Sequence, residues 1–178
     1  MSSKGTTDIA ARLGARSASP FRTILFVLVQ ISWGFIQSLI GFTIFVGNIR
    51  SPHTLFHGAL VTEWKHSSGV SLGLFVFVPQ GCPRRLVVHE YGHCVQSLVL
   101  GPLYVVAIML PSMLWAGLPQ MKKRRASKDV SYYSLYTEKS ADWLGVQVCG
   151  EDAMARRFMV STQGCKDENM TTFADKSV

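Results

Sequence analysis

A run of 24 residues without a single charge, from Thr23 to Val46, limits what this chain can fold into more than any other feature. As one α-helix the run would be roughly 36 Å long, at about 1.5 Å per residue, which is enough to cross a bilayer. It is too long for the apolar core of a signal peptide, and no A-x-A cleavage site follows it. We therefore expect an N-terminal transmembrane helix over residues 23–46 and an integral membrane protein.

Polar and small side chains inside this run are spaced so that they share faces of the helix. Gln30 and Gln37 lie seven residues apart on one face, and Gly34 and Gly41 do so on a neighbouring face. Glycines allow close approach and glutamines form hydrogen bonds between helices. We therefore expect this side to pack on protein rather than on lipid.

The composition of the whole chain also favours contact with lipid. Of its 178 residues, 48% are hydrophobic and only 16% are charged, whereas soluble proteins average about 25% charged residues. The formal net charge is +7, and the basic residues gather beside apolar segments: Arg12, Arg16 and Arg22 before the first, and Lys122, Lys123, Arg124 and Arg125 after the second. This placement indicates lipid headgroups as partners and argues against binding to nucleic acid.

The length fits one domain, which we place at residues 21–160, between a basic, disordered N-terminus at 1–20 and a polar tail at 161–178. Its expected elements, in order, are the transmembrane helix 23–46, a β-hairpin at 57–79, a helix at 84–100, an apolar segment broken by prolines at 102–121 and a helix at 129–147. The sequence thus predicts a mainly α-helical membrane protein.

The motif His-Glu-Tyr-Gly-His, residues 89–93, lies within the helix expected at 84–100. His89 and His93 share one face of that helix, with Cβ atoms about 5–6 Å apart, so both imidazoles can reach one zinc ion. Glu90 stands beside this face, where it can take a proton from an attacking water and return it to a leaving amine. The spacing predicts a zinc site with Glu90 as catalytic base.

A third ligand is needed, because catalytic zinc usually has three protein ligands and an open fourth position. The segment Tyr-Thr-Glu-Lys-Ser-Ala-Asp at 136–142 offers Glu138 as that ligand. Asp142 follows one turn later on the same expected helix. It could accept the free ring N–H of a ligating histidine and so fix its tautomer.

HExxH followed by ExxxD resembles the pattern of the gluzincin metallopeptidases. The form Glu-x-x-Ala-Asp, here Glu138, Ala141 and Asp142, is similar to that of the membrane-bound CAAX prenyl endopeptidase and HtpX group. The short chain also resembles a minimal gluzincin. The resemblance covers residues 84–145, about a third of the chain.

This resemblance implies zinc on His89, His93 and Glu138, with Glu90 as general base. It also implies that peptide substrates bind along a β-strand edge, which we expect near residues 70–78. The family's further substrate-stabilising residue has no clear counterpart here, and the tyrosines near the ExxxD helix are the candidates for it.

The apolar stretch between His93 and Glu138 presents a geometric conflict. If residues 94–121 crossed the bilayer, the two ligands would lie on opposite sides. A bend at Gly101-Pro102 removes the conflict, because 84–100 and 103–119 then form a re-entrant or interfacial hairpin. The positive-inside rule gives opposite orientations for the N-terminus and for the flanks of this hairpin, so the side of the active site stays open.

The sequence therefore predicts a membrane-embedded, zinc-dependent endopeptidase acting on peptides or membrane proteins. Two alternatives are a non-catalytic membrane scaffold or binding protein on a degenerate peptidase fold, and a zinc hydrolase of a non-peptide substrate. The cysteines Cys82, Cys94, Cys149 and Cys165 show no CxxC spacing. We expect reduced thiols, although the spacing does not exclude a disulfide.

Overall fold

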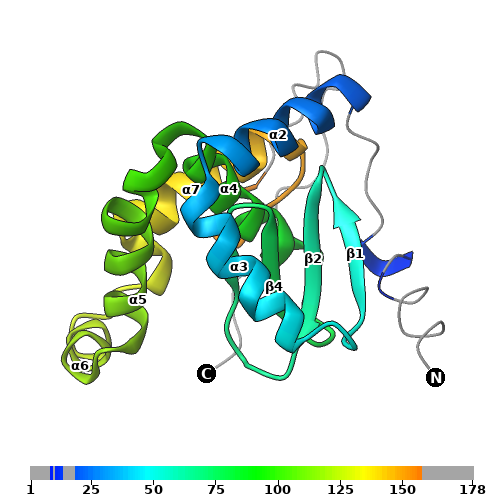
Figure 1. Ribbon diagram of the computed structural model, residues 1–178. Helices are drawn as coiled ribbons and strands as arrows, with labels where there is room; N and C mark the ends of the chain where they lie inside the picture. Colours follow the sequence, from blue (N-terminus) through cyan, green and yellow to red (C-terminus); the bar gives the residue numbers. More distant parts are fainter. Residues whose placement is uncertain (1–8, 10, 14–18, 158–178) are drawn as a thin grey trace, which may run out of the picture.

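The computed structural model describes residues 9, 11–13 and 19–157 (Figure 1). Its elements are α2 (Pro20–Ser32), α3 (Phe35–Gly47), β1 (His53–Phe56), β2 (Ala59–Trp64), β3 (Val70–Leu72), β4 (Phe75–Pro79), α4 (Arg84–Leu100), the short η1 (Gly101–Leu103) and η2 (Val105–Met109), α5 (Leu110–Gly117), α6 (Pro119–Ser127), η3 (Tyr132–Ser134) and α7 (Tyr136–Cys149). The expected predominance of helix is confirmed. The polar tail expected at 161–178 lies outside the described residues.

The uncharged run at 23–46 forms two helices rather than one. α2 and α3 meet at Trp33-Gly34 and are bent by 95° relative to each other. Gly34 lies directly over Gln30, and a Cβ at this position would come within 2.2 Å of the Gln30 side-chain oxygen. The prediction of one continuous helix is therefore wrong. Within the described part of the chain, no single helix is both long and apolar enough to cross a membrane, although two bent pairs pass by length and composition.

Four strands form one mixed sheet in the order β1-β2-β4-β3. The prediction of a simple hairpin at 57–79 is wrong, because β2 and β4 pair in parallel. The second run splits at Gly73 (φ 63°), so that β3 folds back antiparallel on β4 and becomes an edge strand. Sequence reasoning also missed β1, which a turn at His57-Gly58 joins to β2. Both turn residues have positive φ (48° and 93°), as in a type I′ hairpin.

The helix expected at 84–100 has the predicted bounds, and the chain bends sharply after it. α4 with η1 is bent by 120° relative to η2 with α5. This bend falls between Leu103 and Val105, shortly after the expected Gly101-Pro102. Gly101 has a φ of 54°, which suits glycine, and its backbone packs against the Trp33 ring. The ExxxD helix begins at Tyr136 rather than at residue 129, because the preceding residues form a turn and η3.

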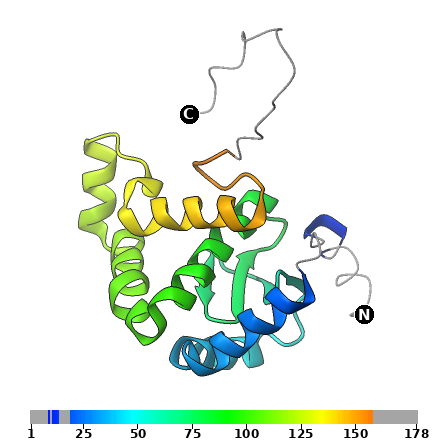
Figure 2. The same ribbon diagram turned by 90° about the horizontal axis from the view of Figure 1, so that it is seen from above.

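α4 occupies the centre of the fold. Figure 2 shows α7 on one side of it and α2 with α3 on the other. The main core joins apolar side chains of the sheet, α4 and α7, and includes Ile9 and Leu13 from the N-terminal stretch that was expected to be disordered. Cys82, Cys94 and Cys149 are buried free thiols, and Cys165 lies outside the described residues.

Candidate metal and catalytic site

Two glycines allow α4 and α7 to approach until their backbones touch. A Cβ on Gly92 would lie 1.9 Å from the carbonyl oxygen of Ala141, and a Cβ on Gly145 would lie 2.3 Å from that of Val88. Real Cβ atoms do not come so close, so only glycine permits this crossing. The close approach places the ExxxD residues of α7 against the HExxH residues of α4.

His89, His93 and Glu138 form the centre of the site. Their ligand atoms all lie within 4.8 Å of one another, and all three residues are buried. Oε2 of Glu138 lies 3.2 Å from Nε2 of His89 and 3.6 Å from Nε2 of His93. Ligands at about 2.0–2.1 Å from a tetrahedral metal are about 3.4 Å apart. The three side chains could therefore hold one metal ion.

Asp142 orients the first histidine, in the position that the sequence predicted. Nδ1 of His89 donates to Oδ1 of Asp142 at 2.7 Å, so that Nε2 faces the other ligands. Asp142 in turn accepts from the backbone N–H groups of Met154 (3.1 Å) and Ala155 (2.8 Å). The loop after α7 thus fixes the carboxylate that fixes the imidazole.

Gln96 plays the same part for the second histidine, and sequence reasoning missed it. Nδ1 of His93 donates to Oε1 of Gln96 at 2.7 Å. The Gln96 amide then donates to the Thr137 carbonyl oxygen (2.9 Å) and to Ser140 Oγ (2.7 Å), both on α7. The available signal was a hydrogen-bonding side chain three residues after His93, on the same helix face.

Ser112 holds the third ligand and was also missed. Its hydroxyl donates to Oε1 of Glu138 at 2.5 Å, and the Thr137 hydroxyl donates to the same oxygen at 3.1 Å. Oε2 is thereby left to face the two histidines. Ser112 lies on α5, so the bend after α4 has a direct role: it returns the chain to the site.

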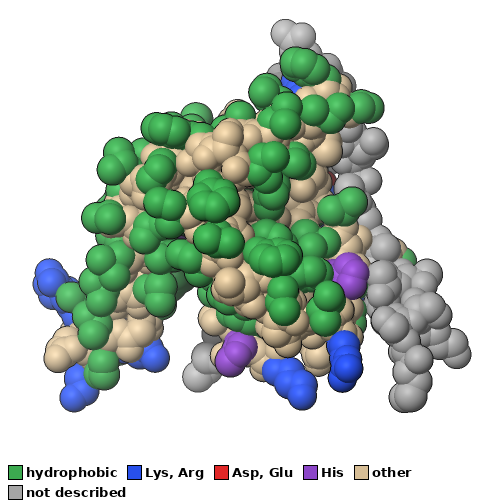
Figure 3. Space-filling view, viewed as in Figure 1, with side chains coloured by type: hydrophobic (Ala, Val, Ile, Leu, Met, Phe, Trp, Pro, Cys, Tyr) green, Lys and Arg blue, Asp and Glu red, His purple; other side chains and the backbone are tan. Residues whose placement is uncertain are grey.

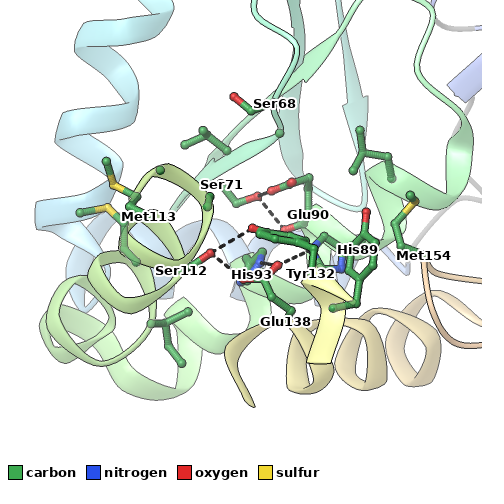
Figure 4. A pocket seen from close by; sticks show the side chains of 18 of the residues that line it. Ser68, Ser71, His89, Glu90, His93, Ser112, Met113, Tyr132, Glu138 and Met154 are labelled. Carbon is green, nitrogen blue, oxygen red and sulfur yellow. Dashed lines mark hydrogen bonds and ion pairs between the residues drawn. The ribbon is translucent and has the colours of Figure 1, made fainter. Parts of the chain in front are cut away.

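Glu90 stands beside the ligand group rather than in it (Figure 4). Its Oε2 accepts from Ser71 Oγ at 2.6 Å, and the same hydroxyl lies 2.8 Å from the Glu90 carbonyl oxygen. Gly69 packs against this carboxylate, because a Cβ there would lie 2.0 Å from Glu90 Oε1. The edge strand β3 and the residues before it therefore position the candidate base.

A cavity of about 670 Å³ joins the ligands, Glu90, residues 67–71 and the inner side of α5. Arg125 also lines this cavity, with its guanidinium 5.0 Å from the Trp115 ring centre and 5.6 Å from that of Tyr132. Tyr133 packs edge-on against the His89 ring at 5.2 Å between ring centres. The cavity is large enough for a segment of an extended peptide.

Electrostatics in the metal-free site favour a charged histidine beside a charged carboxylate. Burial lowers the pKa of His89, but hydrogen bonds to Asp142 and Glu138 outweigh burial and raise it to about 10. Burial raises the pKa of Glu138, but hydrogen bonds from His89 and His93 prevail and hold it well below its usual range. A bound metal would replace the imidazolium proton in this pair.

The structure thus brings together every residue that the sequence assigned to the site: His89, Glu90, His93, Glu138 and Asp142. It adds Gln96, Ser112 and Ser71 as their immediate partners. Comparison of the chain with known protein families, with curated proteins and with solved structures found no match.

Proposed function

We propose that this protein is a zinc-dependent endopeptidase. The observation that carries the proposal is the convergence of three buried ligand atoms and a separate, positioned carboxylate on one cavity. Two imidazoles and a carboxylate form a ligand set typical of catalytic zinc, and Asp142 and Gln96 supply the partners that such histidines need. The resemblance of HExxH and ExxxD to the gluzincin pattern supports the same assignment.

The roles of the side chains follow from their positions. When bound, zinc would polarise a substrate carbonyl and lower the pKa of a water molecule beside it. Glu90 takes the proton of the attacking water and passes it to the leaving amine. Ser71 holds the Glu90 carboxylate toward the cavity. Burial and nearby carboxylates raise the pKa of Tyr133 to about 12, so its hydroxyl keeps its proton and can donate to a developing oxyanion.

Peptides are the substrate class that the surroundings of the site favour. β3 is an edge strand that pairs with β4 on one side and borders the cavity. An extended peptide can add to such an edge through main-chain hydrogen bonds. The Tyr104 hydroxyl donates to the Ser71 carbonyl oxygen at 2.9 Å, and a substrate strand that pairs at this residue replaces that bond.

The proposed place of action is a membrane, with lipid as one partner and a peptide or membrane protein as the substrate. Large apolar side chains point outward from α2, α3 and α5, whereas the amides of Gln30 and Gln37 are buried. Water-facing helices show the opposite arrangement. The apolar composition of the chain agrees with this location.

Glu90→Gln is the substitution that tests the proposed reaction. The zinc-loaded, detergent-purified wild type should cleave members of a broad peptide library, read by mass spectrometry. Glu90→Gln should lower the rate by about 100-fold or more while zinc content stays the same. Asp129→Asn, an equivalent carboxylate-to-amide change at an exposed residue, is the control and should keep full activity.

Two results would contradict the proposal. Equal cleavage by Glu90→Gln and wild type would remove Glu90 from the reaction. A zinc-loaded wild type that cleaves no peptide would favour the non-catalytic scaffold, or a hydrolase of another substrate class if Glu90→Gln abolishes a different hydrolysis.

A further inference from the structure

α2 and α3 expose their apolar side chains and bury their polar ones. Leu25, Leu28 and Ile31 on α2 and Ile36, Leu39 and Phe42 on α3 are all between 47% and 54% exposed. Figure 3 shows apolar side chains gathered over these helices and continuing onto the α5 side. We name this surface, formed by α2, α3, η2 and α5, the apolar face.

Hydrogen bonds from two buried amides tie the inward side of the same helices to α4 and η1. The Gln30 amide donates to the Cys94 carbonyl oxygen and accepts from Ser97 Oγ, both at 3.0 Å. The Gln37 amide donates to Ser97 Oγ (2.8 Å) and to the Gly101 carbonyl oxygen (3.0 Å). These bonds fix which side of each helix faces outward. The apolar side chains of this face are therefore held outward by hydrogen bonds on the opposite side of the helices.

Charges around the apolar face have one sign. No Asp or Glu occurs from residue 9 to residue 62 or from residue 91 to residue 128. Basic side chains stand at the margins: Arg22 at the start of α2, Arg50 just after α3, and Lys122, Lys123 and Arg124 on α6. Figure 3 shows basic side chains along the lower margin of this view.

A second cavity, of about 830 Å³, lies at the end of α3 beside the apolar face. Arg50, Lys65 and His66 line it together with Gln80 and the other residues of 46–52. Two cationic side chains at one cavity are suited to a phosphate group. A phosphate next to exposed apolar helices is the chemistry of a phospholipid.

We propose that the apolar face inserts into one leaflet of an anionic phospholipid membrane, with a headgroup phosphate in the Arg50–Lys65 cavity. Because α2 and α3 are bent by 95°, both bury their exposed sides only when both lie near the membrane plane. Each basic side chain at the margin then meets the anionic headgroup layer. This inference deepens the membrane association proposed above and does not depend on the peptidase activity.

One consequence concerns the substrate. Met113 on α5 is 59% exposed and also lines the active-site cavity. The apolar face and the cavity therefore share a wall. Chain segments that lie at the membrane surface are thus the ones closest to the site.

Depth measurements with nitroxide labels test the inserted geometry. The full chain carries Cys165→Ser, and one label is attached through Leu28→Cys, Ile36→Cys or Lys139→Cys, the last on α7. In vesicles of phosphatidylcholine and phosphatidylglycerol, the labels on α2 and α3 should collide more with oxygen and less with a water-soluble nickel chelate than the α7 label. Labels at Phe21→Cys and Phe42→Cys should report similar depths.

Three results would overturn this geometry. The α2 and α3 labels could be as accessible to nickel as the α7 label. A depth difference of a whole bilayer between residues 21 and 42 would show a crossing. Shielding of the same labels without vesicles, in a species with the mass of a dimer, would assign the face to a second copy.

Vesicle flotation tests the headgroup site. Wild-type protein should partition at least tenfold more strongly into vesicles with 30% phosphatidylglycerol than into pure phosphatidylcholine. Arg50→Glu with Lys65→Glu should lose about tenfold or more of that partition, whereas Lys139→Glu with Arg157→Glu, the same charge change near α7, should lose much less. If both double variants lose the same amount of vesicle partition, the effect comes from net charge, and the Arg50–Lys65 cavity is not a headgroup site. Neither the depth measurement nor the flotation uses zinc or hydrolysis. A failure of the membrane proposal can therefore be told apart from a failure of the peptidase proposal.

Discussion

α4 is covered by two helical layers that pack against it in opposite ways. α7 meets it through glycines and encloses ionisable side chains, with Glu138 and Asp142 both at 1% exposure or less. α2 and α3 meet it through neutral amides and hydroxyls, and turn large apolar side chains outward.

The difference fits the two roles proposed above. Buried ionisable groups are costly unless they are paired or hold a metal, so the α7 side suits the proposed metal site. Buried amides that bond to a neighbouring helix leave no charge behind, and they fix the orientation of the helix. The proposed metal site and the proposed membrane-anchoring surface therefore lie on opposite sides of one helix.

Gly92→Ala should disrupt the packing of α7 on α4 and cause the largest loss of stability. Its Cβ would lie 1.9 Å from the Ala141 backbone, so the helices must separate. We expect a loss of about 3 kcal/mol or more in stability, measured by thermal unfolding in detergent. Gly47→Ala, where a Cβ would meet nothing within 4 Å, is the control. Similar melting temperatures for both variants would contradict the close crossing.

Two single substitutions on opposite faces of α2 should affect different measurements: Gln30→Leu should affect stability, and Leu28→Gln should affect vesicle binding. Gln30→Leu leaves the Ser97 hydroxyl with fewer partners and should cost about 1–3 kcal/mol of stability. Leu28→Gln lies on the exposed side, so it should hardly change stability in detergent but should weaken vesicle binding. A stable Gln30→Leu variant together with unchanged vesicle binding of Leu28→Gln would refute the assigned orientation of α2.

Gln96→Ala should weaken metal binding without removing a ligand. Loss of the partner that orients His93 is expected to lower zinc affinity by about 10–100-fold, measured by competition with a chelating dye. Gln96→Glu restores an acceptor for Nδ1 of His93 and should recover part of that affinity. If both variants bind zinc like the wild type, Gln96 has no positioning role.

The stability of the metal-free protein should also depend on pH. The pKa of His89 is raised to about 10, against about 6.5 in an unfolded chain. Its contribution to stability is therefore complete below about pH 6.5 and declines as the pH rises toward 10. The melting temperature of the metal-free protein should fall between pH 6.5 and 8.5, and zinc should raise it more at the higher pH.

Asp142→Asn removes the strongest of the hydrogen bonds that raise this pKa and should flatten the decline. A metal-free protein whose melting temperature rises with pH over this range would contradict the charged state assigned to His89.

The clustering of the candidate site residues could be anticipated because the position of each within its motif depends on local spacing. His89, Glu90 and His93 are fixed by one helix, and Glu138 and Asp142 by another, so the geometry within each group follows from the period of a helix. Their meeting depended on Gly92 and Gly145. Nothing in the sequence shows which glycines are contact points, since the clash that they avoid exists only in the folded chain.

Tertiary contacts explain what the sequence did not predict. A charge-free run carries no mark of its bend, which depends on the packing of Gly34 over Gln30. The parallel pairing of β2 with β4 depends on the reversal at Gly73. Ser112 and Ser71 come from segments remote from the motif, and serine hydroxyls are too common for a pattern to identify them.

The most direct test of the account is the zinc content per chain of the detergent-purified protein. Wild type should hold about one zinc, and His93→Ala and Glu138→Ala should hold little or none, whereas Glu90→Gln should keep it. This result would establish the metal and its ligands together. Absence of zinc from the wild type after purification in zinc-containing buffer would contradict the account at its centre. Zinc retained in Glu138→Ala alone would remove the third ligand.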